Sequence, residues 1–486
     1  MLSRPPLVGF SKSSHLAPLV GVAFASLALL GGERPAEASG YLAARFGSDH
    51  GTPAMANTYA IYFNPAALGG TTGSNLTLDL SLAFRWASYS RTQEALSPSD
   101  PSTLANPDYR AANTGNATLV NLLALPFLGV TTDFGMKNNK TIGIHGGFAT
   151  YVPFGGLATW NKRDDAPANV PGATDGVQRW HNISGQILAI YNTLAASFTI
   201  KPLRLSIGAS LSAVIHHVAT VRARNLDGSD DTLIGNTLIE GRSLINVWGL
   251  NFGASFGAYF EPLEDRSLRI GYAYLTQPGF GETRMSGTLK QTLGTAKEDS
   301  TPINLLQEYP DIHRIGVSWR ATKRVELRSD FEYVRWSTFT RQCVVREGQA
   351  CDVAADGADQ SNGKVILNIP RNWNDAVGFR IGGSYFISDS AEVFFGTGFT
   401  TSAVPKTTID ASTIDAFRLY FTGGAKFQLS KHWGVAASYN HIAFLNVNTN
   451  GANDLNGFKD VSRSPSGDGV YRAVLGLVNL NVNYTF

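Results

Sequence analysis

The C-terminal end of the chain alternates strictly between apolar and polar side chains. Leu480, Val482, Tyr484 and Phe486 occupy one set of positions, and three asparagines and Thr485 occupy the other. Successive side chains of a β-strand point to opposite faces, so this pattern predicts a strand with one wholly apolar face that ends on an aromatic residue. Such a strand requires an apolar medium on one side and a polar one on the other.

The N-terminal end has the features of a secretory signal peptide. Arg4 and Lys12 supply positive charge, residues 16–30 form a run of apolar and small residues, and an Ala-x-Ala cleavage sequence follows. A membrane span needs roughly 20 apolar residues, so this run is short for a transmembrane anchor. We therefore expect residues 1–38 to be a signal peptide that directs export.

No later segment has the pattern of a transmembrane helix, because polar residues interrupt every apolar stretch. The other fold that can cross a membrane is a closed β-barrel, which satisfies its backbone hydrogen bonds internally. Composition favours the barrel over a soluble domain. Glycine occurs 50 times, and only 16% of residues are charged, against about 25% in soluble domains.

Period-two segments bounded by turn signals follow one another from residue 74 onward, and they number about fourteen. The connections between them alternate between short and long, which is typical of outer-membrane barrels with short periplasmic turns and longer extracellular loops. We predict an all-β fold, with a barrel of about fourteen antiparallel transmembrane strands over residues 74–486 and both termini in the periplasm. The long loops are expected at 91–116, 155–178, 225–242, 290–310, 342–373, 404–415 and 446–470.

Several predicted strands carry charged residues on the face opposite their apolar face. A charge that faced lipid at mid-depth would cost about 2–4 kcal/mol, so these charges are expected to face the lumen. There they could receive a carboxylate through charge-assisted hydrogen bonds, or they could pair with acidic residues across the lumen. The candidate cations are Arg204, Arg380, Arg418 and Lys426, and the acidic residues are Glu326, Asp330 and Glu332.

Residues 39–73 precede the first predicted strand and are rich in glycine and in apolar side chains, among them Tyr41 and Phe46. A flexible linker would lack such side chains, so we expect this segment to be a plug, or hatch, inside the lumen. Asn64 and Pro65 predict a helix start, with the asparagine as N-cap and the proline at the first helical position. A plugged barrel is not a water-filled porin.

The two cysteines, Cys343 and Cys351, lie in one predicted loop. Export places them in an oxidising compartment, so a disulfide is expected. Closing so short a loop would contribute roughly 2.5 kcal/mol in the chain-entropy model. No metal site is predicted, since the adjacent His216 and His217 would point to opposite faces of a strand. No cofactor, catalytic constellation or nucleic-acid partner is expected, the last because the net charge is only +2.

Short motifs in a fixed order resemble those of the FadL/TodX family of outer-membrane transport proteins for long-chain fatty acids and aromatic hydrocarbons. The resemblance runs from residue 39 to residue 486. It includes a hatch with an Asn-Pro-Ala motif, the end of the third strand, a Trp-Ser-x-Phe pattern and a Pro-x-Asn-Trp-x-Asp pattern. These motifs fall at residues 39–41 and 64–68, 151–155, 334–339 and 369–375.

This resemblance implies ligand capture by the outer loops, passage to an internal pocket near the hatch, and lateral exit beside a kinked third strand. The hatch residues that it singles out are Tyr41 at the pocket floor, with Phe46, Asn64, Pro65 and Ala66. Proline removes a backbone donor and glycine marks bulges, so both can interrupt the third strand; they could equally be ordinary strand-end residues. The residues for this kink are Gly146, Gly147, Pro153 and Gly155.

The function implied is passive transport of hydrophobic molecules, with long-chain fatty acids first. The protein is expected to be a monomer without enzymatic activity that contacts outer-membrane lipid and lipopolysaccharide. One alternative is uptake of aromatic or aliphatic hydrocarbons by the same route. The other is a lipid-hydrolysing enzyme barrel, for which His145, His181 and His441 are present but have no catalytic motif around them.

Overall fold

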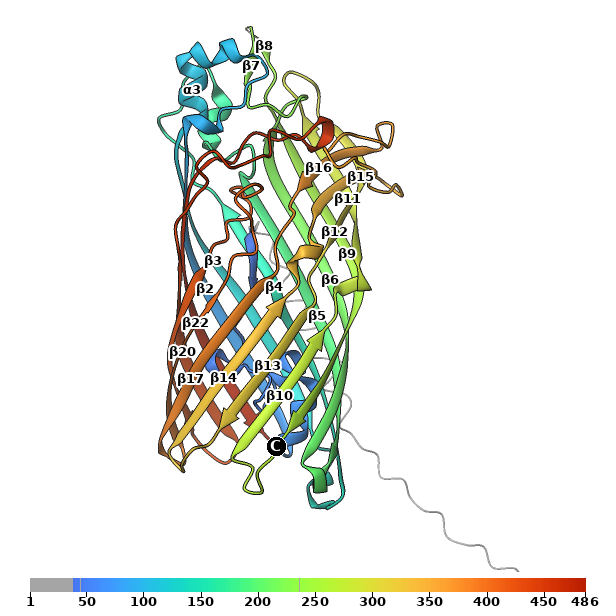
Figure 1. Cartoon of the computed structure of the whole chain (residues 1–486), viewed down its shortest axis with the longest axis vertical. Coiled ribbons are helices and arrows are strands. Elements are labelled where there is room, and N and C mark those ends of the chain that lie inside the picture. Colours follow the sequence, from blue (N-terminus) through green and yellow to red (C-terminus); the bar gives the residue numbers. More distant parts are fainter. Residues whose placement is uncertain (1–37, 44, 236) are drawn as a thin grey trace, which may run out of the picture. The chain divides into compact units, whose positions relative to one another are not determined.

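The computed structural model describes residues 38–43, 45–235 and 237–486. The predicted signal peptide, residues 1–38, lies outside the described residues except for its last position. The described residues all belong to one compact unit, Ala36–Phe486. This unit is a closed antiparallel β-barrel of fourteen strands, which confirms the predicted fold class (Figure 1).

Barrel strands pair in chain order, and the first strand closes onto the last. The pairing of β2 with β22 runs from Asn75 with Thr485 to Arg91 with Gly469. Some barrel strands are interrupted and carry two labels. The strands of the wall are β2 (Ser74–Arg91), β3 (Gly115–Thr132), β4 (Ile142–Thr159), β5 (Ser184–Ile200), β6 (Leu205–Arg224), β9 (Gly241–Phe260), β10 (Leu268–Leu275) with β11 (Glu282–Thr292), β12 (Asp299–Glu308) with β13 (Ile312–Trp319), β14 (Val325–Val334) with β15 (Arg341–Arg346), β16 (Val365–Pro370) with β17 (Ala376–Ser388), β18 (Ala391–Thr400), β19 (Arg418–Gln428), β20 (Trp433–Phe444) and β22 (Gly469–Thr485).

The remaining elements are short. The strands among them are β1 (Ala38–Ala43), β7 (Leu233–Ile234), β8 (Thr237–Leu238) and β21 (Val447–Asn448), and the helices are η1 (Ser48–His50), α2 (Ala60–Phe63), η2 (Pro65–Gly70), η3 (Gln93–Ala95), η4 (Pro101–Ala105), α3 (Pro107–Asn113), η5 (Met136–Asn138), η6 (Pro171–Asp175), η7 (Lys201–Leu203), η8 (Pro278–Phe280), η9 (Trp336–Thr338) and η10 (Asp460–Ser462). Among the described residues, no helix combines the length and the apolar character needed to cross a membrane.

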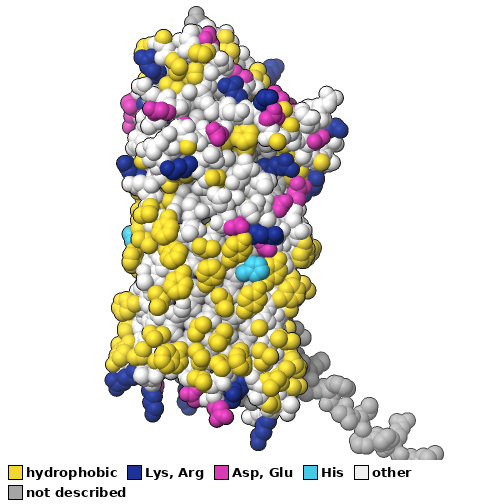
Figure 2. Space-filling model, viewed as in Figure 1, with side chains coloured by type: hydrophobic (Ala, Val, Ile, Leu, Met, Phe, Trp, Pro, Cys, Tyr) yellow, Lys and Arg dark blue, Asp and Glu magenta, His cyan; other side chains and the backbone are white. Residues whose placement is uncertain are grey.

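The predicted strand faces are present in the barrel. On β19, Phe421 and Phe427 point outward and are exposed, and on β17 the outward Ile381 is exposed while its neighbour Arg380 is buried inside. Figure 2 shows an apolar belt across the lower part of the visible face, with lysines and arginines below it. The two-residue period therefore separates an apolar medium outside from a polar interior.

Beyond the belt, toward the end that carries the long loops, the pattern reverses. On β11 the outward residues Glu282, Arg284 and Lys290 are exposed, whereas Met285 and Leu289 are buried inward. The prediction of a loop at 290–310 is therefore wrong, since most of this segment belongs to the end of β11 and to β12. Beyond the apolar belt the outer face of the wall meets water, so the outward residues of the strands are no longer apolar.

A similar extension occupies the loop predicted at 342–373. This segment contains the end of β15 and all of β16, and the hairpin between them carries a disulfide. Cys343 and Cys351 are joined across a Cα–Cα distance of 6.1 Å, within the usual range for a disulfide. The disulfide links the hairpin loop, through Cys351, to the buried Cys343 of β15.

Candidate functional site

The segment from Arg45 to Gly73, called the hatch from here on, lies inside the barrel near the short-turn end (Figure 1). Its predicted helix start is present. Asn64 Oδ1 accepts a hydrogen bond from the backbone nitrogen of Ala66 at 3.1 Å, and Pro65 occupies the first position of η2. The Asn64 amide nitrogen donates to the carbonyl oxygens of Pro53 and Ala258, so one side chain caps the helix and bonds the hatch to β9.

Wall glycines allow the hatch to approach one side of the barrel very closely. A Cβ atom at Gly257 of β9 would lie 2.0 Å from Asn64 Oδ1, and one at Gly271 of β10 would lie 1.9 Å from the carbonyl oxygen of Pro53. Gly208 of β6 approaches the hatch backbone in the same way. Any larger residue would displace the hatch from these strands, because such distances are well below van der Waals contact.

Charged groups of the neighbouring strands also hold the hatch, since β13 pairs with β10 on one side and with β14 on the other. Arg328 of β14 donates to Asp49 Oδ2 from Nε at 3.0 Å and from Nη2 at 2.6 Å. Arg314 of β13 donates to the hydroxyl of Tyr62 at 2.7 Å and to its carbonyl oxygen at 3.2 Å, and pairs with Glu332 at 2.6 Å. Breaking such buried pairs leaves an uncompensated charge, so they fix the position of the hatch.

Two of the predicted lumen cations are engaged by acidic neighbours. Arg380 donates to Asp330 Oδ2 at 2.6 Å, and the two residues face each other across the β14–β17 ladder. Arg418 pairs with Asp415 and donates to the hydroxyl of Tyr420 at 2.7 Å. The interpretation of these arginines as structural ion pairs fits the geometry.

The other two candidate cations lie elsewhere. Arg204 is not a lumen residue: it ends the turn before β6 with a φ of 53° and donates to the carbonyl oxygen of Pro262 at 3.2 Å. The sequence pattern placed it on the strand face because the turn extends two residues past Pro202. Lys426 is exposed and lines a polar cavity of about 300 Å³ between the hatch and the wall, together with Asp79 and Asn481.

The ladder between β3 and β4 stops partway along the wall. Pairing runs from Thr132 with Gly146 to Phe127 with Tyr151, and the two fully described strands share no ladder beyond that point. On its other side, β4 slips against β5 between Tyr151 and Phe154, where one extra residue forms a β-bulge. Pro153 lies in this bulge, as expected for a residue that lacks a backbone donor.

The glycines predicted for this kink have another role. Gly146 and Gly147 are paired on both sides of β4, so they do not interrupt the ladder, and that prediction is wrong. A Cβ atom at Gly147 would lie 2.8 Å from the side chain of Ile61, so this glycine makes room for the hatch. The sequence prediction of the kink did not include Pro126, which lies next to Phe127, the last residue of β3 that pairs with β4.

Hydrogen bonds rejoin the two strands farther along. The backbone nitrogen of Thr159 donates to Asn121 Oδ1 at 3.2 Å, and that of Asn161 donates to the carbonyl oxygen of Thr118 at 2.9 Å. The stretch over which β3 and β4 do not pair with each other is called the wall interruption from here on. It comprises residues 122–126 of β3 and 152–158 of β4.

A short N-terminal strand occupies the free edge of β4 in the wall interruption. β1 pairs with β4 through Leu42 with Gly155 and Ala43 with Phe154. Gly155, predicted as a kink residue, is therefore paired with β1 as well as with β5. Tyr41 belongs to β1, but its side chain lies outside the described part of the chain.

Aromatic rings meet next to the wall interruption. The Trp373 ring contacts those of Phe339 and Trp336 at centroid distances of 4.7 and 4.9 Å. Trp336 in turn contacts Phe154, in the bulged part of β4, at 6.2 Å. Two motifs that lie apart in the sequence, 334–339 and 369–375, thus come together beside β4.

The same series of rings continues to the hatch. Phe154 contacts Tyr191 at 6.3 Å, Tyr191 stacks on Tyr151 at 5.6 Å, and Tyr151 contacts Phe46 of the hatch at 5.7 Å. Phe46 is fully buried at this end. We call the series the aromatic track; it consists of Phe339, Trp373, Trp336, Phe154, Tyr191, Tyr151 and Phe46.

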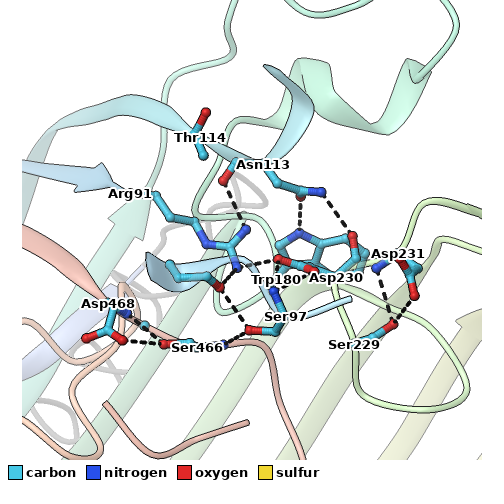
Figure 3. Close-up of polar contacts among 12 residues, drawn as sticks. Arg91, Ser97, Asn113, Thr114, Trp180, Ser229, Asp230, Asp231, Ser466 and Asp468 are labelled. Atoms are coloured by element: carbon cyan, nitrogen blue, oxygen red, sulfur yellow. Dashed lines mark hydrogen bonds and ion pairs between the residues drawn. The ribbon is translucent and has the colours of Figure 1, made fainter. Parts of the chain in front are cut away.

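The long loops are joined above the track by a buried polar network (Figure 3). Arg91, at the end of β2, donates to Asp230 at 2.7 Å and to the carbonyl oxygen of Asn113 at 3.0 Å. Asp230 accepts from the backbone of Ser97 at 3.0 Å, and the Ser97 hydroxyl accepts from the backbone of Ser466 at 3.1 Å. These contacts join the loops after β2, β6 and β20 into what we call the loop cap.

A second buried cluster adds the loop after β4 to the loop cap. Arg179 bonds Glu240 from Nε at 3.0 Å and from Nη2 at 3.1 Å, and Arg242 bonds the same carboxylate at 2.8 Å. Burial alone would raise the pKa of Glu240, but the two guanidinium groups hold it below its ordinary value. The loop cap is therefore a set of interlocked charges rather than a group of independent loops.

Comparison with known proteins agrees with this architecture. A family model described as "Outer membrane protein transport protein (OMPP1/FadL/TodX)" matches residues 36–486. Among curated proteins, the chain is 25% identical over 250 residues to the 47 kDa outer membrane protein of Pasteurella multocida, covering 49% of this chain and 51% of that protein. It is 23% identical over 203 residues to the outer membrane protein NMB0088 of Neisseria meningitidis, covering 42% and 41%. The chain spans about half the length of the curated relatives it matches.

Solved structures share the fold at low sequence identity. A FadL homologue of Pseudomonas aeruginosa superposes with a TM-score of 0.69 at 15% identity, covering 93% of this chain and all of that one. The toluene transporter TbuX of Ralstonia pickettii gives 0.56 at 15%, covering 92% and 99%. The toluene transporter TodX of Pseudomonas putida gives 0.58 at 13%, covering 90% and 95%.

Proposed function

The chain belongs to the OMPP1/FadL/TodX family of outer membrane transport proteins, and we propose that it moves small hydrophobic molecules passively along the aromatic track and releases them sideways through the wall interruption. One observation carries the proposal. Phe154 is at once a member of the track and a residue of the interrupted edge of β4. The track therefore leads to a place where β3 and β4 share no ladder and the short strand β1 occupies the edge of β4.

The surroundings of the wall interruption favour lateral release. Val120 and Leu122 of β3, beside it, are exposed on the outer face by 70% and 57%. An apolar solute that moves from the lumen to this surface enters lipid without crossing water, which avoids the cost of hydrating its apolar area. In this orientation the short turns and both termini face the periplasm, and the loop cap faces outward among the lipopolysaccharide. The protein acts as a monomer.

The preferred substrate class is neutral aromatic hydrocarbons, in place of the long-chain fatty acids that the sequence suggested first. Aromatic side chains make up the track, and stacked or edge-on ring contacts favour flat apolar solutes. The predicted receivers of a carboxylate support this choice, because Arg380 already pairs with Asp330 and Arg418 with Asp415. The solved TodX and TbuX structures are described as toluene transporters.

Lipid hydrolysis has less support. The histidines considered for it, His145, His181 and His441, lie on β4, in the loop cap and on β20, far apart along the ladder of strands. The family is one of transport proteins.

Uptake by cells tests the proposal directly. The full chain is expressed in a Gram-negative host that lacks transporters of this kind, and uptake of labelled toluene and labelled oleate is measured. A variant with Pro126→Val and Pro153→Val regains two backbone donors at the edges of the wall interruption. We expect it to take up less toluene, because the β3–β4 ladder can extend. Pro202→Val, at a turn, is the matched control.

Each result has a distinct meaning. Equal toluene uptake by the double variant and the native chain, with both folded in the outer membrane, would exclude lateral exit at this place. Uptake of oleate without uptake of toluene would keep the route and replace the substrate with fatty acids. Uptake of neither would contradict the transport proposal as a whole.

A further inference from the structure

Beneath the loop cap, three arginines gather around a small cavity that the transport route does not use. Arg222 and Arg224 lie two residues apart on β6 and so point to the same face of the strand. Both line a cavity of about 20 Å³, which Arg463 of the loop after β20 also lines. Like charges so close together repel one another unless a negative charge lies between them.

The hydrogen-bond donors around this cavity lack acceptors. Arg222 is only 8% exposed, and its Nε has no hydrogen-bond partner among the described residues. The same holds for Arg224 Nη1 and for the hydroxyl of Ser464, which is 2% exposed and lines the cavity. A buried donor without an acceptor costs about 1–3 kcal/mol, and more when the group is charged. Three at one cavity indicate that an acceptor belongs there.

Nearby carboxylates do not fill this role. Asp410 lies within electrostatic reach of Arg222. However, Arg371 already donates to Asp410 Oδ2 at 2.8 Å, and the backbone nitrogen of Ser412 donates to Asp410 Oδ1 at 2.7 Å. Asp460 is the acidic residue that lines the cavity, and it is exposed to solvent and forms no ion pair with the arginines of the described chain. Asp227 lies within electrostatic reach of Arg463 alone, whose Nη1 donates to the Asp227 carbonyl oxygen at 3.4 Å. Arg222 and Arg224 therefore have no carboxylate ion pair among the described residues.

We propose that this cavity binds one small monovalent anion, held by Arg222, Arg224 and Ser464. Its volume suits a halide-sized ion, since a single water needs roughly 10–15 Å³. The same chemistry would accept the carboxylate group of an amphiphile that reaches in through the cavity mouth. By joining β6 to the loop after β20, the anion stabilises the closed loop cap, because a ligand that binds the folded state alone adds to its stability.

Anomalous diffraction tests the site. Crystals of the full chain in detergent are grown in bromide, and we expect an anomalous peak within hydrogen-bond distance of Arg222 Nε and Arg224 Nη1. The peak should be lost in Arg222→Gln and weakened in Ser464→Ala, which keeps both charges, and it should remain in Arg346→Gln, a control at an exposed arginine. Electron density at the cavity without an anomalous signal from bromide would refute the proposal. So would an anomalous peak that persists there in Arg222→Gln.

Unfolding temperatures test the stabilising role and the source of the anion. The native chain should unfold at a higher temperature in bromide than in gluconate at equal ionic strength, and Arg222→Gln should lose this difference while Arg346→Gln keeps it. Equal temperatures for the native chain would contradict stabilisation by the anion. Addition of laurate distinguishes the two sources: displacement of the bromide peak identifies a carboxylate headgroup, and its retention identifies an inorganic anion.

Discussion

Arg328 Nη2 lies 2.6 Å from Asp49 Oδ2 and joins β14 to a residue 279 positions earlier in the chain. Nε of the same arginine bonds the same oxygen at 3.0 Å, and its Nη1 bonds Glu326 at 2.9 Å. One guanidinium thus bonds two buried carboxylates, one on the hatch and one on the wall, and Arg269 adds positive charge 3.5 Å from the second. The hatch is held to the wall both by such charged contacts and by close approach to wall glycines.

Arg328→Met is expected to loosen the hatch. The substitution leaves Asp49 buried without its arginine partner, whereas Glu326 keeps Arg269 at 3.5 Å. A broken buried pair costs about 3–5 kcal/mol. Ion conductance in planar bilayers should rise, since a displaced hatch opens a polar path. Lys323→Met, at an exposed turn, should leave the conductance unchanged. An unchanged conductance in Arg328→Met would show that this pair does not hold the hatch.

Gly257→Ala is expected to displace the hatch by crowding. The added Cβ would lie 2.0 Å from Asn64 Oδ1, so the N-cap and its bond to β9 must shift. Overpacking of this kind costs typically about 1–3 kcal/mol. Amide hydrogen exchange of the hatch helices should accelerate in the purified protein.

Gly423→Ala is the matched control for this substitution. Its added Cβ would meet only the ring of Phe395 at 3.4 Å, an ordinary contact. Exchange in the hatch should match that of the native chain. If both alanine variants behave alike, close approach at Gly257 is not what positions the hatch.

Phe154→Ala is expected to weaken ligand binding and uptake. The ring bridges Trp336 and Tyr191, and its loss breaks the aromatic track where the track meets the wall interruption. Toluene binding by titration calorimetry should weaken several-fold, because loss of one ring contact removes about 0.5–1.5 kcal/mol beyond the area term. Phe256→Ala, which removes an outward ring that is 53% exposed, should bind as the native chain does. Native affinity in Phe154→Ala would remove this residue from the route.

Acid is expected to open the loop cap through His181. Burial lowers the pKa of this imidazole from 6.5 to about 4, and Asp410, Arg91 and Arg222 are the charged groups that act on it. The folded state disfavours the proton, so stability is lost as the pH falls from 6.5 toward 4, by about 3 kcal/mol at the full shift. Protease cleavage in the long loops should increase over this interval.

The variant His181→Gln isolates this effect. It carries no titrating group at that position, so its cleavage rate should stay flat from pH 6.5 down to 4.5, below which Glu240, whose pKa is lowered in the folded state, begins to lose its own stabilising contribution. Asp410 does not confuse the measurement: Arg371 and His181 lower its pKa to about 2 against the effect of burial, so its stabilising contribution is lost only as the pH falls below 3.8. A native chain whose loops are equally resistant at both pH values would contradict the role of His181.

Predictions from the sequence were accurate where residues close by in the sequence decide the local structure. Asn64 and Pro65 begin η2 as predicted, because a cap depends on the side chain and backbone of adjacent residues. Cys343 and Cys351 are close enough to bond because they lie near each other in one hairpin. In both cases local geometry is sufficient.

Predictions failed where a residue's role depends on a distant segment. Gly146 and Gly147 looked like breaks in a strand, but Gly147 is small because Ile61 of the hatch lies against it. The break itself needs Pro126 and Pro153, which lie on two strands, and neither alone indicates where the other strand passes. The reversed faces of β11 were missed because the edge of the apolar belt is a property of the whole barrel.

The sequence by itself determined the class of the fold, because lipid outside and polar groups inside impose a two-residue period on each strand that needs no knowledge of its neighbours. The tertiary structure alone decided which charges are available to a ligand. Arg380 faces Asp330 and Arg314 faces Glu332 because of the register between adjacent strands. Register is set by the closure of the whole barrel, so the sequence left open whether Arg380 would receive a ligand or pair with an acidic residue, and it did not single out Arg314.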